Sequence, residues 1–403
     1  MTPIATERLN VAILVIGQTL FMVASITVMT LSGLVGRALG PDPGLATLPI
    51  AMMMLGTVIS TLPASLYMKR VGRRAGFITG AGIGGIGGGL LAFGAVVLGS
   101  FWLFCLGNLL LGLYQGFAMY YRFAAADVAS PAWRPRAMSF VMAGGVVAAF
   151  LGPWNANAAS DWIAAAPSSG PYLVIALLAL LSVGLLAFLR VPTSGEPRVG
   201  DPQRPMAEIA RSRRFIVAAL AAASGYAIMI VVMTATPLAM RGVGFELGDV
   251  ALVMQWHVLG MFAPSFFTGG LIARFGHARI LLAGCALLGA SALTAAQGDT
   301  LMLFWSALVL LGIGWNFLFI GGSALLTTAH SEAERGKVQG INDLLIFALV
   351  TLGALLAGKL LHLVGWATLN LAMLPLILLV ALAALWLGGP VTPRAASAVG
   401  DAK

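Results

Sequence analysis

The sequence KRVGRR at residues 69–74 is a short basic turn between two long apolar stretches, and ARFGHAR at residues 273–279 is a second one. Gly276 follows Gly72 by 204 residues, about half of the 403-residue chain. Arg136 and Lys337 have nearly the same spacing, because they stand 201 residues apart at the start of equivalent apolar stretches. The spacing predicts two repeats that follow one another in parallel.

The composition is that of a membrane protein. Hydrophobic residues make up 60% of the chain and charged residues 9%, and the mean hydropathy is +0.97. Soluble domains contain about 25% charged residues, whereas a membrane-spanning helix needs about 20 mostly apolar residues. The length accommodates twelve such spans. We predict them at 9–34, 47–68, 75–98, 101–125, 137–160, 172–190, 213–240, 247–273, 280–297, 301–328, 338–363 and 366–388.

The predicted fold is an all-α membrane protein with twelve transmembrane helices in two pseudo-symmetric six-helix halves. The longest polar stretch, 191–212, falls between the sixth and seventh spans and is rich in Pro, Gly, Arg and Ser. It is predicted to link an N-terminal half (1–190) to a C-terminal half (213–388), which a tail follows (389–403). Two such repeats with a substrate site between them near the membrane midplane are a known transporter plan.

The basic residues predict the orientation, because cytoplasmic loops carry an excess of Lys and Arg. With both termini inside, all but four of the 23 basic residues fall on the cytoplasmic side, and the four are Arg37, Arg122, Arg241 and Lys359. The net charge of +9 therefore reflects membrane topology and does not indicate nucleic-acid binding. The two cysteines, Cys105 and Cys285, lie in separate spans, which favours neither a disulfide framework nor a thiolate metal site.

The turn after the second span resembles a motif of the major facilitator superfamily, G-x-x-x-D-R-x-G-R-R. Four of its positions are occupied in register by Arg70, Gly72, Arg73 and Arg74, while Ser65 and Lys69 replace the Gly and the Asp. The second copy keeps Gly269, Arg274 and Gly276 but has Ala273 at the acidic position, and Gly152-Pro153 resembles a further motif in span five. The resemblance implies a secondary transporter that works by alternating access, and no enzyme.

Few charged side chains are predicted inside the membrane, where such groups usually mark a transport path. No Glu or Asp falls at the centre of a predicted span. Arg122 is the only basic residue well inside a span, and two interpretations remain open: a side chain that reaches to the inner interface, or a substrate-pathway group partnered by Asp127 or Asp343. Asn316 and other intramembrane amides are interpreted as contacts between helices.

Methionine and histidine form a pattern in spans seven and eight. Met229 and Met233 stand four residues apart, as do His257 and Met261, so each pair shares a helix face. Met229 and His257 each lie 16 residues from the predicted cytoplasmic end of their span, which is roughly 24 Å at 1.5 Å per residue. Soft thioethers select soft metals such as Cu(I), and imidazole also ligates copper. The simpler alternative is that these methionines only fill the core.

At these positions the chain resembles the CcoA-like copper importers, which carry the same two pairs in the same spans. The resemblance implies uptake of copper, as a transported substrate and not a cofactor, across the bacterial inner membrane to supply cytochrome oxidase assembly. It also implies contact with copper chaperones, and we expect a monomer. Gln255 and Trp256 are predicted to flank the path, and Met254 is predicted to act as a relay on it. Contributions from the first half are predicted at Met22, Met29 and Met52–Met54.

Two rival functions remain open at this point. The first is transport of a small organic molecule, riboflavin-like or drug-like, with Trp256, Trp315, Tyr120 and Phe123 as an aromatic pocket. The second is a membrane receptor or assembly factor that binds metal without moving it.

Overall fold

The computed structural model describes residues 3–130, 133–191, 204–331 and 334–388, and every regular element within them is a helix. The first half contains η1 and η2, which are a 3₁₀ and a π segment, and eight α-helices. These elements are α1 (Pro3–Leu39), η1 (Pro43–Leu45), α2 (Leu48–Val71), α3 (Arg73–Thr79), η2 (Gly80–Gly87), α4 (Gly88–Val97), α5 (Phe101–Ala118), α6 (Tyr121–Val128), α7 (Arg134–Ala158) and α8 (Gly170–Leu186).

The second half follows the same plan. Its elements are α9 (Met206–Ala210), α10 (Arg213–Gly242), α11 (Leu247–Phe262), α12 (Ser265–Phe275), α13 (His277–Ala295), α14 (Leu301–Leu326), α15 (Arg335–Leu371) and α16 (Leu374–Gly388). The described end of the predicted linker contains the short helix α9, while residues 192–203 and the predicted tail, 389–403, lie outside the described residues.

Each predicted span corresponds to one helix or to a short series of helices. Among the described residues, eight helices are long and apolar enough to cross a membrane, and nine if the bent pair α11–α12 counts as one span. One of the eight, Lys337–Gly388, has 52 residues, far more than one crossing needs. Gly365 interrupts it with a φ of 76°, at the predicted boundary between spans eleven and twelve. At 17 residues, α8 is an apolar helix shorter than these eight. The all-helical membrane fold is confirmed.

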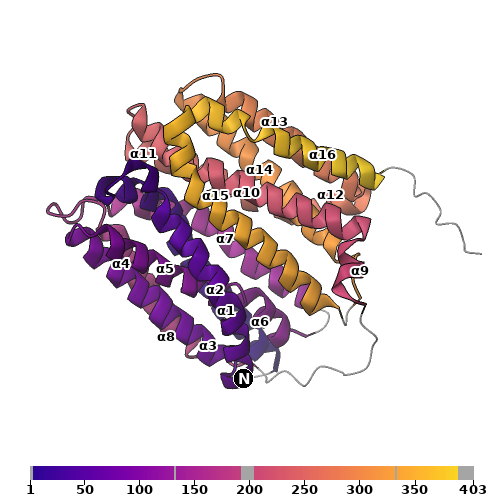
Figure 1. Cartoon of the computed structure of the whole chain (residues 1–403). Coiled ribbons are helices and arrows are strands. Elements are labelled where there is room, and N and C mark those ends of the chain that lie inside the picture. The colour runs from indigo at the N-terminus through magenta and orange to yellow at the C-terminus, as the bar shows by residue number, and fades with distance from the viewer. Residues whose placement is uncertain (1–2, 131–132, 192–203, 332–333, 389–403) are drawn as a thin grey trace, which may run out of the picture.

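The two halves lie side by side, with the indigo-to-magenta helices on one side and the pink-to-yellow helices on the other (Figure 1). The most extensive contacts between them are those of α7 with α11 and of α2 with α15, and further contacts join α1 to α10 and α11 and η1 to α15. The repeat extends to the backbone, because Gly72 has φ 86° and ψ 157° and Gly276 has φ 82° and ψ 160°. Only glycine adopts this conformation readily, so each basic turn depends on its glycine.

The halves are joined at the end that the basic residues predict to be outer. The Thr47 hydroxyl, just before α2, donates to the carbonyl of Leu355 at 3.4 Å and accepts from the Gly358 N–H of α15 at 3.1 Å. A β-carbon on Gly358 would lie 3.0 Å from both the methyl and the hydroxyl of Thr47. The absence of a side chain at Gly358 therefore lets α15 close onto α2.

Replacing Gly358 by valine is expected to separate α15 from Thr47 and open the contact between the halves, because overpacking a close contact costs about 1–3 kcal/mol. The measurement is the reaction of an impermeant maleimide with a cysteine at Val35, a buried position on α1, after Cys105 and Cys285 are replaced. Labelling should rise severalfold. Gly340→Val on the same helix is the control, because a β-carbon there meets no atom within 4 Å. Equal labelling of the two variants would refute the role of Gly358.

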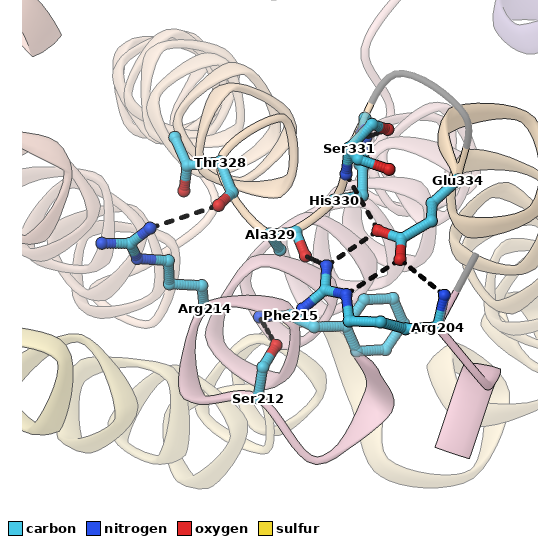
Figure 2. Close-up of polar contacts among 9 residues, drawn as sticks. All are labelled: Arg204, Ser212, Arg214, Phe215, Thr328, Ala329, His330, Ser331 and Glu334. Atoms are coloured by element: carbon cyan, nitrogen blue, oxygen red, sulfur yellow. Dashed lines mark hydrogen bonds and ion pairs between the residues drawn. The ribbon is translucent and has the colours of Figure 1, made fainter. Parts of the chain in front are cut away.

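An ion pair fastens the end of the predicted linker to the turn before α15 (Figure 2). The Arg204 guanidinium donates through Nε and Nη2 to the two carboxylate oxygens of Glu334, at 2.8 and 2.7 Å. The backbone N–H of Arg204 also donates to Glu334. The N–H of Ser331 donates to the same carboxylate, and Arg204 further donates to the carbonyl of Ala329. The Glu334 side chain is only 2% exposed.

These donors, with the Arg204 side chain first, hold the pKa of Glu334 well below its ordinary value of 4.5. A lowered pKa means that the ionised carboxylate stabilises the docked linker above pH 4.5 and that this contribution is lost as the pH falls below that value. Amide hydrogen exchange in α9, corrected for its intrinsic pH dependence, should therefore accelerate in acid. Glu334→Gln should accelerate it at neutral pH, whereas Glu208→Gln, at an exposed position, should not. Unchanged exchange in Glu334→Gln would contradict this prediction.

Candidate functional site

A cavity of about 190 Å³ lies between the two halves. It is bordered by α1, α2, α5, α6 and α7 from the first half and by α10, α11, α14 and α15 from the second. The residues that line it are Gln18, Phe21, Met22, Ser25, Ile26, Met29, Met54, Gln115, Met119, Arg122, Met142, Tyr226, Met229, Ile230, Met233, Val258, Met261, Phe262, Trp315, Phe319, Asp343, Ile346 and Phe347.

Aromatic side chains of the second half form one wall of this cavity. Trp315 and Phe319, one helical turn apart on α14, are stacked with 4.9 Å between ring centroids and 9° between ring planes. Tyr226 of α10 lies 5.4 Å from each of them, and Phe262 and Phe347 complete the group at 6.2 Å from Trp315 and 6.4 Å from Tyr226. Such a wall suits a flat, polarisable ligand, because aromatic pairs gain energy beyond the burial of their area.

Three of the four predicted copper ligands border the cavity. Met229, Met233 and Met261 all line it, and Met22, Met29 and Met54, which are among the first-half methionines that the sequence singled out, join them. Met119 and Met142 add two further thioethers. Within the described part of the chain, no group of three or more His, Cys, Asp or Glu side chains is placed to hold a metal. Any metal bound here would depend on methionine sulfur.

The fourth predicted ligand, His257, is fully buried between α11 and α14 and is not among the residues that line the cavity. Its Nδ1 lies 2.8 Å from the carbonyl of Leu308. A carbonyl only accepts, so Nδ1 carries the proton and donates. Nε2 is then the lone-pair nitrogen, and it has no hydrogen-bond partner among the described residues.

Three predicted pathway residues, Met254, Gln255 and Trp256, do not line the cavity. Met254 is buried one turn before Val258, towards the predicted outer end where Thr47 contacts α15, and Gln255 is half-buried. Trp256 is 39% exposed and packs against Trp305 at 5.6 Å. Trp256 precedes Val258, which lines the cavity, by two residues. That spacing corresponds to about 200° of helix rotation, so Trp256 faces away from the cavity. These three residues therefore lie outside the cavity lining, and their part in a transport path stays a prediction.

Of the three charged residues predicted to lie on the pathway, Arg122 and Asp343 line the cavity and Asp127 does not. Asp127 pairs with Arg73 at 2.6 Å, which joins the end of α6 to the start of α3, so it is not the predicted partner of Arg122. Arg122 and Asp343 line the cavity from opposite halves and attract one another electrostatically. Arg122 also lies 4.8 Å from the Phe123 ring, and Asp343 accepts a hydrogen bond from Asn342 at 3.3 Å. One basic and one acidic group therefore reach the cavity.

A helix break positions Met261. The axes of α11 and α12 differ by 42°, and Pro264 at the break removes a backbone donor. Asn316 of α14 donates from Nδ2 to the carbonyl of Met261 and to the hydroxyl of Ser265, both at 2.7 Å, and its Oδ1 accepts from the Thr268 hydroxyl at 2.7 Å. The predicted role of Asn316 as a contact between helices is confirmed.

The sequence interpretation assigned no role to several cavity residues, namely Gln115, Tyr226, Phe262, Phe319 and Phe347. Two signals could have revealed some of them. Gln115 precedes Arg122 by two helical turns, and Trp315 and Phe319 have the same i, i+4 spacing as the methionine pairs. Of the rival aromatic pocket, Trp315 lines the cavity, whereas Trp256, Tyr120 and Phe123 do not. The Tyr120 hydroxyl donates to the carbonyl of Thr61 instead.

Two repeated helical halves around a shared cavity define an integral membrane protein of the secondary-transporter class. The chain belongs to the Major Facilitator Superfamily, whose family model matches residues 14–263 and 218–402. It is therefore a transporter and not an enzyme.

Similar proteins agree with this assignment. The riboflavin transporter RfnT of Brucella anthropi is 45% identical over 382 residues, which cover 94% of this chain and 96% of RfnT. The uncharacterized MFS-type transporter YdeG of Bacillus subtilis is 31% identical over 348 residues, 82% of this chain and 80% of YdeG. The human organic anion transporter MFSD10 shares the fold, with a TM-score of 0.65 at 16% identity over 94% of this chain and 99% of MFSD10. These relatives do not support the narrower prediction of a copper importer.

Proposed function

We propose that this protein transports riboflavin or a closely similar flat heteroaromatic molecule across the bacterial inner membrane, with both termini in the cytoplasm. The observation that carries the proposal is the wall of Tyr226, Trp315 and Phe319 in the cavity between the halves. Such a wall suits a planar ring system. The 45% identity to a riboflavin transporter over 94% of the chain supports the same substrate class.

The size of the cavity has a consequence for the mechanism. At about 190 Å³ it is smaller than most organic-ligand sites, which occupy about 300–1,000 Å³. Binding of a ring system therefore requires the halves to separate or side chains to move. The methionines around the cavity suit this requirement, because their unbranched side chains change conformation at little cost.

The test is uptake of radiolabelled riboflavin by proteoliposomes that contain the purified protein, with empty liposomes as the control. Saturable uptake that unlabelled riboflavin suppresses is the expected result. In cells, expression of the protein should restore growth of a riboflavin auxotroph on low external riboflavin. Uptake no faster than in empty liposomes, under pH and sodium gradients of either direction, would refute the proposal.

Copper import is the second candidate, and one observation favours it: six of the methionines that the sequence singled out border a single small cavity. Thioethers on both halves could hold Cu(I) without a buried carboxylate. The matched experiment is copper uptake by the same proteoliposomes in the presence of a reductant. Met233→Leu keeps the bulk and removes the sulfur, so it should abolish copper uptake if copper is the substrate.

The control for that experiment must come from outside the cavity. Met142 cannot serve, because it lines the cavity together with the predicted ligands. Met240 on α10 and Met254 on α11 are fully buried, lie on the helices that carry the predicted ligands, and do not line the cavity. The controls are therefore Met240→Leu and Met254→Leu. The copper candidate is excluded if neither the wild type nor any variant takes up copper while Met233→Leu still transports riboflavin.

A further inference from the structure

The central cavity contains polar atoms that no described protein group satisfies. Gln115 of α5 is 9% exposed and Trp315 of α14 is 5% exposed, yet Oε1 of Gln115 and Nε1 of Trp315 have no hydrogen-bond partner. Nε of Arg122 on α6 is buried and equally unpartnered. All three residues line the same cavity. Buried polar atoms are nearly always paired in native proteins, so these three point to a ligand that pairs them.

The three atoms define what the ligand must offer. The Gln115 carbonyl oxygen accepts, so the ligand must present a donor to it, whereas the N–H groups of Trp315 and Arg122 donate and require acceptors. A cyclic imide, in which one ring N–H stands between two carbonyl groups, provides one donor and two acceptors along one edge. It is also flat, as the wall of Trp315, Phe319 and Tyr226 requires.

We propose that Gln115, Arg122 and Trp315 bind the imide edge of the transported ring, with Gln115 accepting from the imide N–H. This inference rests on the proposed function and specifies which part of the substrate is recognised. Gln115 and Arg122 belong to the first half and Trp315 to the second, so the imide contacts both halves at once. A site built to pair buried polar groups rejects analogues that leave them unpaired, which makes this edge the specificity determinant.

The test compares riboflavin, whose ring carries such an imide, with N3-methylriboflavin, in which a methyl group replaces the imide hydrogen. Each competes as an unlabelled compound with radiolabelled riboflavin for uptake by proteoliposomes. Wild-type protein should prefer riboflavin at least tenfold, because one hydrogen bond is lost and an acceptor is left unpaired. In Gln115→Leu, riboflavin should weaken about tenfold and the preference should fall to nearly one.

Two further variants keep the test decisive. Gln115→Met has nearly the length of glutamine without its polar atoms and replaces Gln115→Leu if the latter is not inserted. Trp315→Phe keeps a ring but removes the donor, so it should weaken both compounds about tenfold and leave their ratio unchanged. If riboflavin is transported and Gln115→Leu or Gln115→Met retains the wild-type preference, this inference is wrong and the proposed function stands. If wild-type protein transports no riboflavin, both are wrong.

Discussion

Replacing Trp315 by alanine is expected to raise the KM for riboflavin uptake about 10- to 100-fold. Trp315 contributes a ring to the cavity wall and lies stacked on Phe319, so its removal takes away both a contact surface and the support of a second ring. Stacking of a heterocyclic base on an aromatic side chain is worth about 1–3 kcal/mol, which corresponds to a change of about 5- to 150-fold in KM and includes that range. The measurement is initial uptake rate against riboflavin concentration in proteoliposomes, normalised to the amount of inserted protein.

The matched control is Trp256→Ala. It removes the same side chain from a neighbouring helix, but Trp256 is exposed on the surface and contacts Trp305. Its KM should stay within about twofold of wild type, since exposed substitutions away from special features have small effects. If the Trp256→Ala and Trp315→Ala variants lose uptake equally, or if Trp315→Ala keeps the wild-type KM, the aromatic wall is not the binding surface.

Replacing Asn316 by leucine is expected to destabilise the second half severely. The fully buried amide of Asn316 satisfies the Met261 carbonyl and the hydroxyls of Ser265 and Thr268 at the α11–α12 break. Leucine has a similar size but leaves the Met261 carbonyl and the Ser265 hydroxyl without that partner, while the Thr268 hydroxyl keeps its hydrogen bond to the Pro264 carbonyl. Each unsatisfied buried group costs about 1–3 kcal/mol. Thermal unfolding in detergent should begin several degrees lower, and the yield of monodisperse protein should fall sharply.

Asn370→Leu is the control for this substitution. Asn370 is also buried, but within the described residues its amide donates a single hydrogen bond, to the Trp366 carbonyl one turn earlier in its own helix. Its loss should cost much less than the loss of Asn316. Two variants of equal stability would show that the helix break does not depend on Asn316.

The sequence alone determined the fold and its division into two halves. Hydropathy is a local property of each stretch, and a membrane-spanning helix satisfies its backbone hydrogen bonds internally. The spans were therefore predictable without knowledge of their neighbours. The two basic turns revealed the repeat for a similar reason, because Gly72 and Gly276 adopt a backbone conformation that favours glycine.

The sequence also anticipated part of the site. Met229, Met233 and Met261 were selected by spacing and depth, and all three line the cavity. Arg122 and Asp343 were selected because charges are costly in the membrane, and they line it as well. Depth along a helix follows directly from residue number at 1.5 Å per residue, so a sequence can show which residues lie at one level.

Only the tertiary structure decided which helix faces turn towards the cavity. In a soluble protein the polar face of a helix marks solvent, but here lipid-facing and cavity-facing side chains are both largely apolar, so the sequence carries little sign of helix rotation. Rotation placed His257 against the carbonyl of Leu308, left Trp256 exposed, and brought Gln115 and Trp315 to one cavity from residues 200 positions apart. These positions follow from packing between helices, and the substrate class inferred for this transporter follows from them.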